Sequence, residues 1–141
     1  MPGLPSAVLF ACTLNSIRSP MAEAILKSLH RGRVFVDSVG VRAADVDSFA
    51  IEVMAEIGID LAGHRAKSFQ MLDDTSFDLV ISLSPEAQHS AVELTRWMSC
   101  EVEYWPTFDP SVVEGARAVR LDAYRKVRDE LVTRISERFP V

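Results

Sequence analysis

The stretch AVLFACTLNSIRSPMAEAIL, residues 7–26, decides how this chain folds. Its first five residues, Ala7–Ala11, form an unbroken apolar run, which is typical of a strand buried on both faces. Ser19 can cap a helix, and Pro20 suits the first turn of one. Apolar residues then recur at every fourth position before Gly32, at Met21, Ile25 and Leu29. The stretch therefore predicts a strand and a helix joined by a loop that runs from Cys12 to Ser19.

Strands and helices alternate along the rest of the chain. Apolar segments predict further strands at residues 33–39, 76–83 and 101–105. Further helices are predicted from Asp47 or Ser48 to Gly58, from Pro85 to about Met98, and from about Leu121 to Phe139. This alternation predicts an α/β fold, a single three-layer domain over residues 1–141 with a four-stranded parallel sheet and helices on both faces. Such sheets bind ligands beyond the carboxyl ends of their strands, where the loop Cys12–Ser19 is expected.

Composition narrows the classes of partner. The 141 residues include 15 basic and 20 acidic residues, for a net charge of −5, which argues against a nucleic-acid partner. No apolar run approaches the roughly 20 residues of a membrane helix, and the start of the chain lacks the regions of a signal peptide. Two cysteines, Cys12 and Cys100, do not make a disulfide framework. We therefore expect a cytoplasmic protein that binds neither nucleic acid nor membrane.

The predicted loop has the chemistry of an oxyanion site. Cys12 and Arg18 bracket five residues that lead into a helix N-terminus, where backbone N–H groups and the helix dipole favour negative charge. The guanidinium of Arg18 can hold two oxygens of a tetrahedral anion, and Ser19 can donate a hydrogen bond to the Cys12 sulfur. The same field favours the thiolate of Cys12, the form that attacks a bound phosphorus or arsenic atom. A simpler interpretation makes Cys12 a small buried apolar residue and Arg18 a surface residue.

The residues of this loop and of four further segments resemble a known family. The loop CTLNSIRSPMAEAIL is followed by SVG at 38–40, GIDLAGHRAKS at 58–68, DLVISLS at 78–84 and WPTFDP at 105–110. Together they resemble the low-molecular-weight protein tyrosine phosphatases and the arsenate reductases of the same fold. The resemblance implies strand order 2-1-3-4, Cys12 as nucleophile, Arg18 as oxyanion ligand and Asn15 as a brace of the loop. It also implies that substrate is bound by the whole loop: Thr13, Leu14, Asn15, Ser16, Ile17, Arg18 and Ser19.

A general acid is expected in the second half of the chain. Asp109 follows the fourth predicted strand, so the topology of a parallel sheet can bring it to the edge where Cys12 lies. Judged from the residues alone, the pair Asp109-Pro110 equally suits the start of a turn. The resemblance implies the acid role, in which Asp109 protonates the leaving oxygen.

Three functions are consistent with these residues. The first is a phosphatase that hydrolyses phosphomonoesters, with protein phosphotyrosine as the expected substrate, through a phosphocysteine intermediate. The second is an arsenate reductase that uses an external thiol, because no cysteine lies between Cys12 and Cys100 to form an internal relay. The third is an oxyanion-binding module with impaired turnover. All three imply phosphate or arsenate as ligand, with a phosphorylated protein or a small phosphomonoester as substrate of the phosphatase; no cofactor and no metal are expected.

The sequence departs from the family at three places. Leu14 stands where the family has glycine, and a left-handed leucine would cost about 1–2 kcal/mol. Ile17 replaces a second loop cysteine, and Ser111-Val112 replaces the aromatic residues that flank phosphotyrosine.

Of the remaining polar residues, His64 is expected to form a hydrogen bond within a loop. The others are expected on the surface, namely His30, His89 and the charges of the last helix, Arg125, Lys126, Arg128, Asp129 and Glu130, while Cys100 is expected to be buried.

Overall fold

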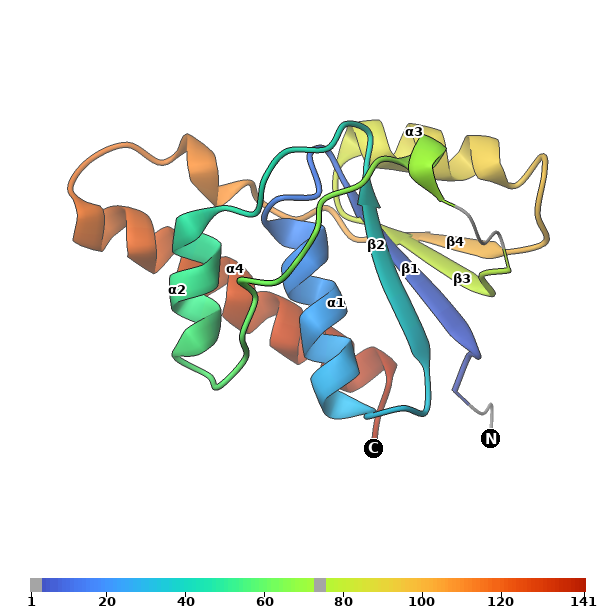
Figure 1. Ribbon diagram of the computed structural model, residues 1–141, viewed down its shortest axis with the longest axis horizontal. Helices are drawn as coiled ribbons and strands as arrows, with labels where there is room; N and C mark the ends of the chain where they lie inside the picture. The colour runs from blue at the N-terminus through green and yellow to red at the C-terminus, as the bar shows by residue number, and fades with distance from the viewer. Residues whose placement is uncertain (1–3, 73–75) are drawn as a thin grey trace.

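A computed structural model of the protein describes residues 4–72 and 76–141. Strands and helices alternate along the chain from the N-terminus, as the apolar pattern predicts (Figure 1). Their bounds are β1 Ala7–Cys12, α1 Arg18–Leu29, β2 Phe35–Gly40, α2 Ser48–Ala55, η1 Phe69–Met71, β3 Leu79–Ser82, α3 Pro85–Leu94, β4 Glu101–Tyr104, η2 Pro110–Val112 and α4 Arg117–Arg138, where η marks a 3₁₀ turn.

The four strands form one parallel sheet in the order β2-β1-β3-β4. β1 is central, since it pairs along its whole length with β2 and also with β3. β4 pairs with β3 at the edge of the sheet. The predicted α/β class, the parallel sheet and the strand order 2-1-3-4 are confirmed.

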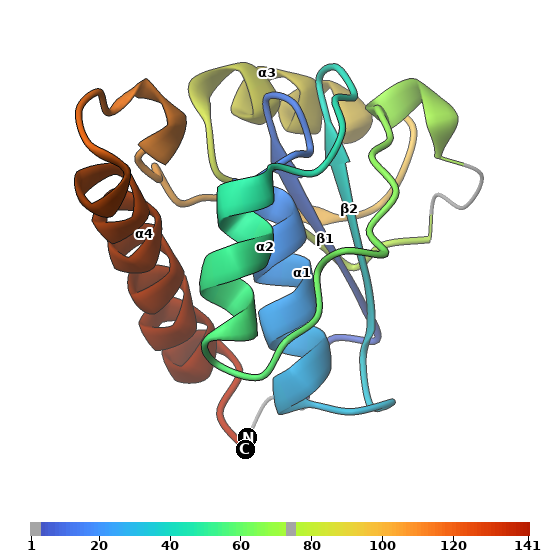
Figure 2. The ribbon, with the colours of Figure 1, turned by 60° about the vertical axis from the view of Figure 1, so that its left-hand side comes forward.

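The side chains of β1 divide between two cores. Val8 and Phe10 pack with α1, α2 and α4 on one face of the sheet. Leu9 and Ala11 face the opposite way and pack with α3. The alternation follows from the pleat of a strand, and it buries all six residues of β1. Figure 2 shows α1, α2 and α4 gathered together, with α3 set apart from them, so helices cover both faces.

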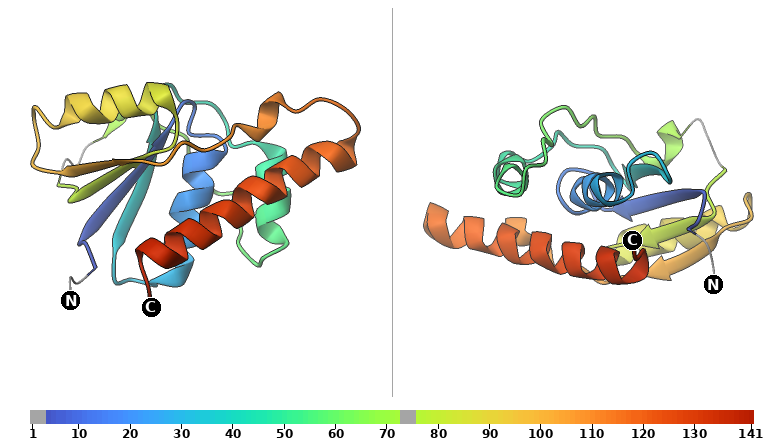
Figure 3. Two further views of the ribbon diagram at one scale, coloured as in Figure 1. Left: turned by 180° about the vertical axis from the view of Figure 1, so that it is seen from behind. Right: turned by 90° about the horizontal axis from the view of Figure 1, so that it is seen from below.

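α4 ties the helices of one face together. It contacts both α1 and α2, and Figure 3 shows it crossing α1 obliquely. Its inner stripe includes Val127, Leu131 and Ile135, while charged residues occupy much of its outer face. Over the two described ranges, no helix combines the length and the apolar character needed to cross a membrane.

Two helix boundaries differ from those predicted. α3 ends at Leu94 instead of about Met98, because the backbone N–H groups of Thr95, Arg96 and Trp97 bond to carbonyls three residues back and form a tighter turn than an α-helix. α4 begins at Arg117, one turn before the predicted Leu121. Its first turn is held by charged contacts that an apolar pattern cannot reveal: Arg117 pairs with Glu52, and the Arg120 guanidinium lies 4.6 Å from the centroid of the Phe49 ring.

Two polar side chains expected on the surface are buried instead. His30 is 1% exposed, and its Nε2 lies 2.6 Å from the Phe139 carbonyl oxygen, which links the end of α1 to the end of α4. Arg128 is also buried and donates to the Val53 carbonyl at 2.8 Å and to Glu56. Both predictions were wrong because the partners, the carbonyl at the end of α4 and a carbonyl of α2, are distant in sequence. His89 is exposed, as expected.

Candidate active site

In the loop between β1 and α1, the backbone carbonyls are hydrogen-bonded to a neighbouring segment, while the described residues leave backbone N–H groups free. The carbonyls of Cys12, Thr13 and Leu14 accept hydrogen bonds from the backbone of Val41, Arg42 and Ala44. These bonds turn the carbonyls outward toward the segment that follows β2. Within the described residues, no group accepts a hydrogen bond from the backbone N–H groups of residues 14–17. A run of such N–H groups at a helix N-terminus is an anion-binding concavity.

The backbone turn of the loop is made by Asn15 and not by Leu14. Asn15 has φ +55°, and it is the residue other than glycine with positive φ among those described. Asparagine tolerates this conformation better than other side chains do. The anticipated strain at Leu14 is therefore absent, and the Leu14 side chain is 39% exposed at the mouth of the site.

Gly40 allows the loop to approach β2 closely. A Cβ at this position would lie 2.6 Å from the Asn15 nitrogen and 2.7 Å from the Leu14 carbonyl carbon. Both atoms belong to the backbone, so no side-chain movement could make room. The segment SVG thus ends in the residue that this loop requires.

The sulfur of Cys12 lies at the end of a buried polar chain. Cys12 is 2% exposed, and its Sγ is 2.9 Å from the Ser19 hydroxyl, which is fully buried. The Asn15 amide donates to that hydroxyl at 2.8 Å and to the Ser38 hydroxyl at 2.9 Å. Because a thiolate can only accept, Ser19 donates to it in the ionised form. Ser19 is not the helix cap that the sequence suggested: Ile17 occupies that position without a side-chain bond, and the Ser19 hydroxyl faces inward.

Two contacts from the segment that contains His64 and Lys67 hold the Asn15 side chain in place. Its Oδ1 accepts from the Lys67 backbone at 3.0 Å and lies 3.0 Å from Nε2 of His64. Burial lowers the pKa of His64, so the neutral ring with a proton on Nε2 suits this contact. The predicted hydrogen bond of His64 within a loop is confirmed, and its partner is the residue that shapes the anion-binding loop.

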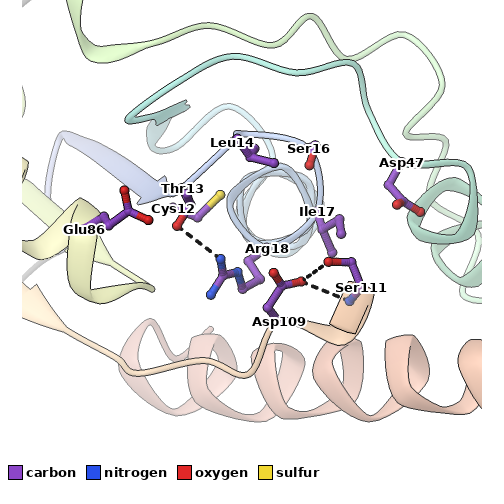
Figure 4. Close-up of a pocket in the computed structure, with 10 residues that line it drawn as sticks. All are labelled: Cys12, Thr13, Leu14, Ser16, Ile17, Arg18, Asp47, Glu86, Asp109 and Ser111. Atoms are coloured by element: carbon purple, nitrogen blue, oxygen red, sulfur yellow. Dashed lines mark hydrogen bonds between the residues drawn. The ribbon is translucent and has the colours of Figure 1, made fainter. Parts of the chain in front are cut away.

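The Arg18 side chain lies beneath the loop. It is 8% exposed, which excludes the interpretation of Arg18 as a surface residue. Nη1 donates to the Thr107 carbonyl at 3.0 Å, and Nη2 lies 3.4 Å from the Thr13 hydroxyl. Figure 4 shows the guanidinium between Thr13 and Asp109. A planar cation held at both ends in this way is preorganised for a tetrahedral oxyanion.

Asp109 approaches the loop from the segment after β4. Its Oδ1 accepts from the backbone nitrogen of Ser111 at 3.0 Å and from the Ser111 hydroxyl at 2.7 Å. It therefore does start a turn, η2, as one interpretation expected. It also lines the same cavity as Cys12 and Arg18, as the other interpretation expected.

These groups surround one cavity of about 280 Å³ (Figure 4). Of the residues predicted from the sequence, the cavity is lined by Cys12, Thr13, Leu14, Ser16, Ile17, Arg18 and Asp109. Asn15 and Ser19 do not line it, since their side chains lie behind the loop and act on its shape and on the sulfur. Sequence reasoning missed three lining residues, Asp47, Glu86 and Ser111. Each of the three follows the carboxyl end of a strand, β2, β3 or β4, and ligands of parallel sheets bind at those ends, so their positions in the sequence could have indicated them.

The aromatic residues near Asp109 do not enter the cavity. Trp105 is buried against Phe10, with ring centroids 6.3 Å apart. Phe108 is 55% exposed and borders a different hollow along α4. The cavity lining accordingly contains no aromatic ring.

The second cysteine lies at the far edge of the sheet. Cys100 immediately precedes β4, whereas Cys12 ends β1, and parallel strands place these positions at opposite edges. Cys100 is half-buried instead of fully buried, and burial raises the pKa of its thiol. An internal thiol relay from Cys12 to Cys100 is excluded by this placement. Among the residues that the structure describes, no group of three or more His, Cys, Asp and Glu side chains could hold a metal ion.

Comparison with known proteins gives one consistent family. The model of the low molecular weight phosphotyrosine protein phosphatase family matches residues 7–138. The glutaredoxin arsenate reductase of Synechocystis sp. is 33% identical over 129 residues, which cover 91% of this chain and 92% of that protein. The low molecular weight protein tyrosine phosphatase of T. tengcongensis has a TM-score of 0.78 at 30% identity, over 93% of this chain and 95% of that chain.

A third similar protein is a solved structure with a phosphorylated serine in its active site. It is a mutant of the arginine phosphatase YwlE with a phosphorylated active-site serine, and its TM-score is 0.76 at 25% identity. The match covers 94% of this chain and 93% of that chain. With the family model spanning nearly the whole sheet and all four helices, the chain belongs to the low molecular weight phosphotyrosine protein phosphatase family.

Proposed function

We propose that the protein hydrolyses phosphomonoesters through a phosphocysteine at Cys12. The observation that carries the proposal is the placement of Asp109 on the same small cavity as the Cys12 sulfur and the Arg18 guanidinium. This cavity brings together a nucleophile, an oxyanion ligand and a proton donor, which are the three groups that a two-step phosphoryl transfer needs.

The first step transfers the phosphoryl group to sulfur. The phosphate oxygens bind the loop N–H groups and Arg18, which places phosphorus in front of Cys12. The thiolate forms an S–P bond as the P–O bond to the leaving group breaks. The carboxylic acid of Asp109 gives its proton to the leaving oxygen, so the product leaves as a neutral alcohol or phenol.

The second step releases phosphate. The Asp109 carboxylate takes a proton from a water molecule that attacks phosphorus, and the S–P bond breaks. Cys12 returns to the thiolate, which the Ser19 hydroxyl stabilises. The phosphorylated active-site serine of the related arginine phosphatase supports a covalent intermediate at this position.

Phosphotyrosine is the expected protein substrate on the basis of the family's name. The cavity lining has no aromatic side chain to flank a phenyl ring. The loop and Arg18 contact the phosphoryl group, which all phosphomonoesters share, so the proposed substrate class is phosphomonoesters in general.

The test is phosphate release from p-nitrophenyl phosphate. Cys12→Ser should abolish turnover, while Cys100→Ser, which changes the other thiol of the chain, should leave it intact. Turnover that survives Cys12→Ser would contradict the proposal.

A second candidate is arsenate reduction with an external thiol, favoured by the 33% identity to the Synechocystis enzyme. Cys12 would displace water from arsenate to form an S–As bond. An external thiolate would then attack the Cys12 sulfur, and the S–As electron pair would reduce arsenic to arsenite as a mixed disulfide forms. A second external thiol would restore Cys12.

Arsenite production in the presence of a small thiol distinguishes the two candidates. Arsenite formed without phosphate release from p-nitrophenyl phosphate would assign the reductase. If neither reaction occurs while calorimetry detects bound phosphate, the site is an oxyanion-binding module.

A further inference from the structure

The cavity that binds the oxyanion has an uneven distribution of charge. Arg18 is the one basic side chain in its lining, and it lies beneath the loop. Three carboxylates line the cavity as well, those of Asp47, Glu86 and Asp109. Asp109 is assigned to proton transfer, whereas Asp47 and Glu86 take no part in the proposed reaction.

Glu86 and Asp47 lie on opposite sides of the loop (Figure 4). Glu86 comes from the first turn of α3, and its side chain is 55% exposed. Its ion pair with Arg42 is 3.4 Å long, and the Arg42 side chain is 60% exposed. An ion pair as exposed as this one is weak, and it leaves much of the Glu86 charge available to a ligand.

The Asp47 carboxylate is fixed in position. Its Oδ1 caps α2 by accepting from the backbone of Phe49 at 2.8 Å, and its Oδ2 accepts from the Tyr124 hydroxyl at 3.0 Å. Burial and the Asp47 carboxylate raise the pKa of Tyr124, and Asp109 adds to that rise. Both Asp47 and Asp109 therefore act on the Tyr124 hydroxyl.

We propose that Glu86 and Asp47 make the site selective for phosphorylated substrates that carry a cationic group, an ammonium or a guanidinium, beside the phosphate. The phosphate binds the loop and Arg18, and a cation beside it faces Glu86 on one side of the loop or Asp47 on the other. A substrate with carboxylates beside the phosphate is repelled by the same charges. This inference rests on the proposed function, because it concerns the same cavity.

Binding to the Cys12→Ala protein tests the inference without requiring turnover, because alanine cannot accept a phosphoryl group. Two phosphotyrosine peptides of equal length, one flanked by lysines and the other by aspartates, are titrated calorimetrically at low salt. We expect the lysine peptide to bind about tenfold more tightly, and the difference to shrink as salt screens the charges. Equal affinities, or tighter binding of the aspartate peptide, would overturn the inference.

Neutral variants in the same Cys12→Ala background identify the residues responsible. Glu86→Gln should reduce the discrimination about two- to fivefold. Asp47→Asn should act similarly, since asparagine keeps the helix cap. Glu93→Gln is the matched control, because Glu93 lies on the same helix outside the cavity lining. Discrimination that is unchanged by both cavity variants would overturn the assignment to these residues.

A pair of small phosphates separates two sources of the cation. O-phosphoethanolamine binding more tightly than glycerol 3-phosphate would extend the selectivity to small molecules, while selectivity confined to the peptides would place the cation on a protein substrate. Failure of the proposed function is recognised separately, because it appears as absent hydrolysis of p-nitrophenyl phosphate by the wild type.

Discussion

The hydroxyl of Ser19 lies 2.9 Å from the sulfur of Cys12, and both groups are almost completely removed from solvent. The hydroxyl also receives a hydrogen bond from the Asn15 amide, so its own proton is directed away from that donor. A hydrogen bond to an ionised acceptor is about twice as strong as one between neutral groups. This contact couples the first turn of α1 to the charge of the nucleophile.

Ser19→Ala removes the donor while retaining a helix-forming residue. We expect kcat/KM for p-nitrophenyl phosphate to fall about ten- to a hundredfold, the range for a lost hydrogen bond to a charged group. Ser28→Ala, on an exposed part of the same helix, is the control and should have no effect. Full activity in Ser19→Ala would show that the contact does not support the thiolate.

Asp109→Asn retains the acceptor for Ser111 and removes the transferable proton. The expected loss in kcat is about a hundred- to ten-thousandfold, with KM little changed. The loss should be greater for phenyl phosphate than for p-nitrophenyl phosphate, because the poorer leaving group depends more on protonation. Asp122→Asn on α4, an exposed position, should have normal kinetics. The same loss for both substrates would argue against general acid catalysis by Asp109.

Gly40→Ala tests whether the close approach of β2 shapes the loop. The added Cβ would lie 2.3 Å from the Arg42 carbonyl oxygen and 2.6 Å from the Asn15 nitrogen. Displacement of these backbone atoms should cost about 1–3 kcal/mol of stability and weaken phosphate binding. Gly63→Ala introduces the same methyl group where no atom lies within 4 Å, and it should be neutral. Thermal unfolding and phosphate titration measure both effects, and a Gly40→Ala protein as stable and as active as the wild type would contradict this packing.

The His64 contact predicts a pH dependence of stability. Burial lowers the pKa of His64 below its ordinary value of 6.5, so the unfolded chain binds a proton at higher pH than the folded chain does. The stability that depends on neutral His64 is present above pH 6.5 and is lost as the pH falls below that value.

His64→Gln keeps an N–H donor for Asn15 and does not titrate. We expect the melting temperature of this variant to change less with pH than that of the wild type between about pH 7.5 and about pH 5.5. His89→Gln, at an exposed histidine, should retain the wild-type slope. A His64→Gln slope equal to that of the wild type would remove His64 as its source.

Local patterns were sufficient for the fold and for the loop. The apolar run of β1 and the alternation of elements predicted the parallel sheet. The spacing of Cys12 and Arg18, between a buried strand and a helix, predicted that the two residues line one site. Both depend on short-range periodicity or on contacts between near neighbours, which a sequence records directly.

Contacts between distant segments were not predictable in the same way. The buried ring of His30 has its hydrogen-bond partner 109 positions away, and Asp47 and Glu86 reach the cavity from the N-terminal ends of two different helices. Leu14 shows a different limit: the family glycine suggested a strained position there, whereas the left-handed residue of this loop is Asn15. Backbone strain in the loop depends on which residue adopts positive φ, and the sequence alone does not show which residue that is.

The central claim is that the Cys12 sulfur bonds covalently to phosphorus. The most direct measurement is mass spectrometry of the Asp109→Asn protein after rapid mixing with p-nitrophenyl phosphate and acid quenching, with Cys12→Ala as the control. We expect a phosphoryl group on the peptide that contains Cys12, appearing together with the first equivalent of nitrophenol. Nitrophenol released in that first turnover with Cys12 unmodified would contradict it.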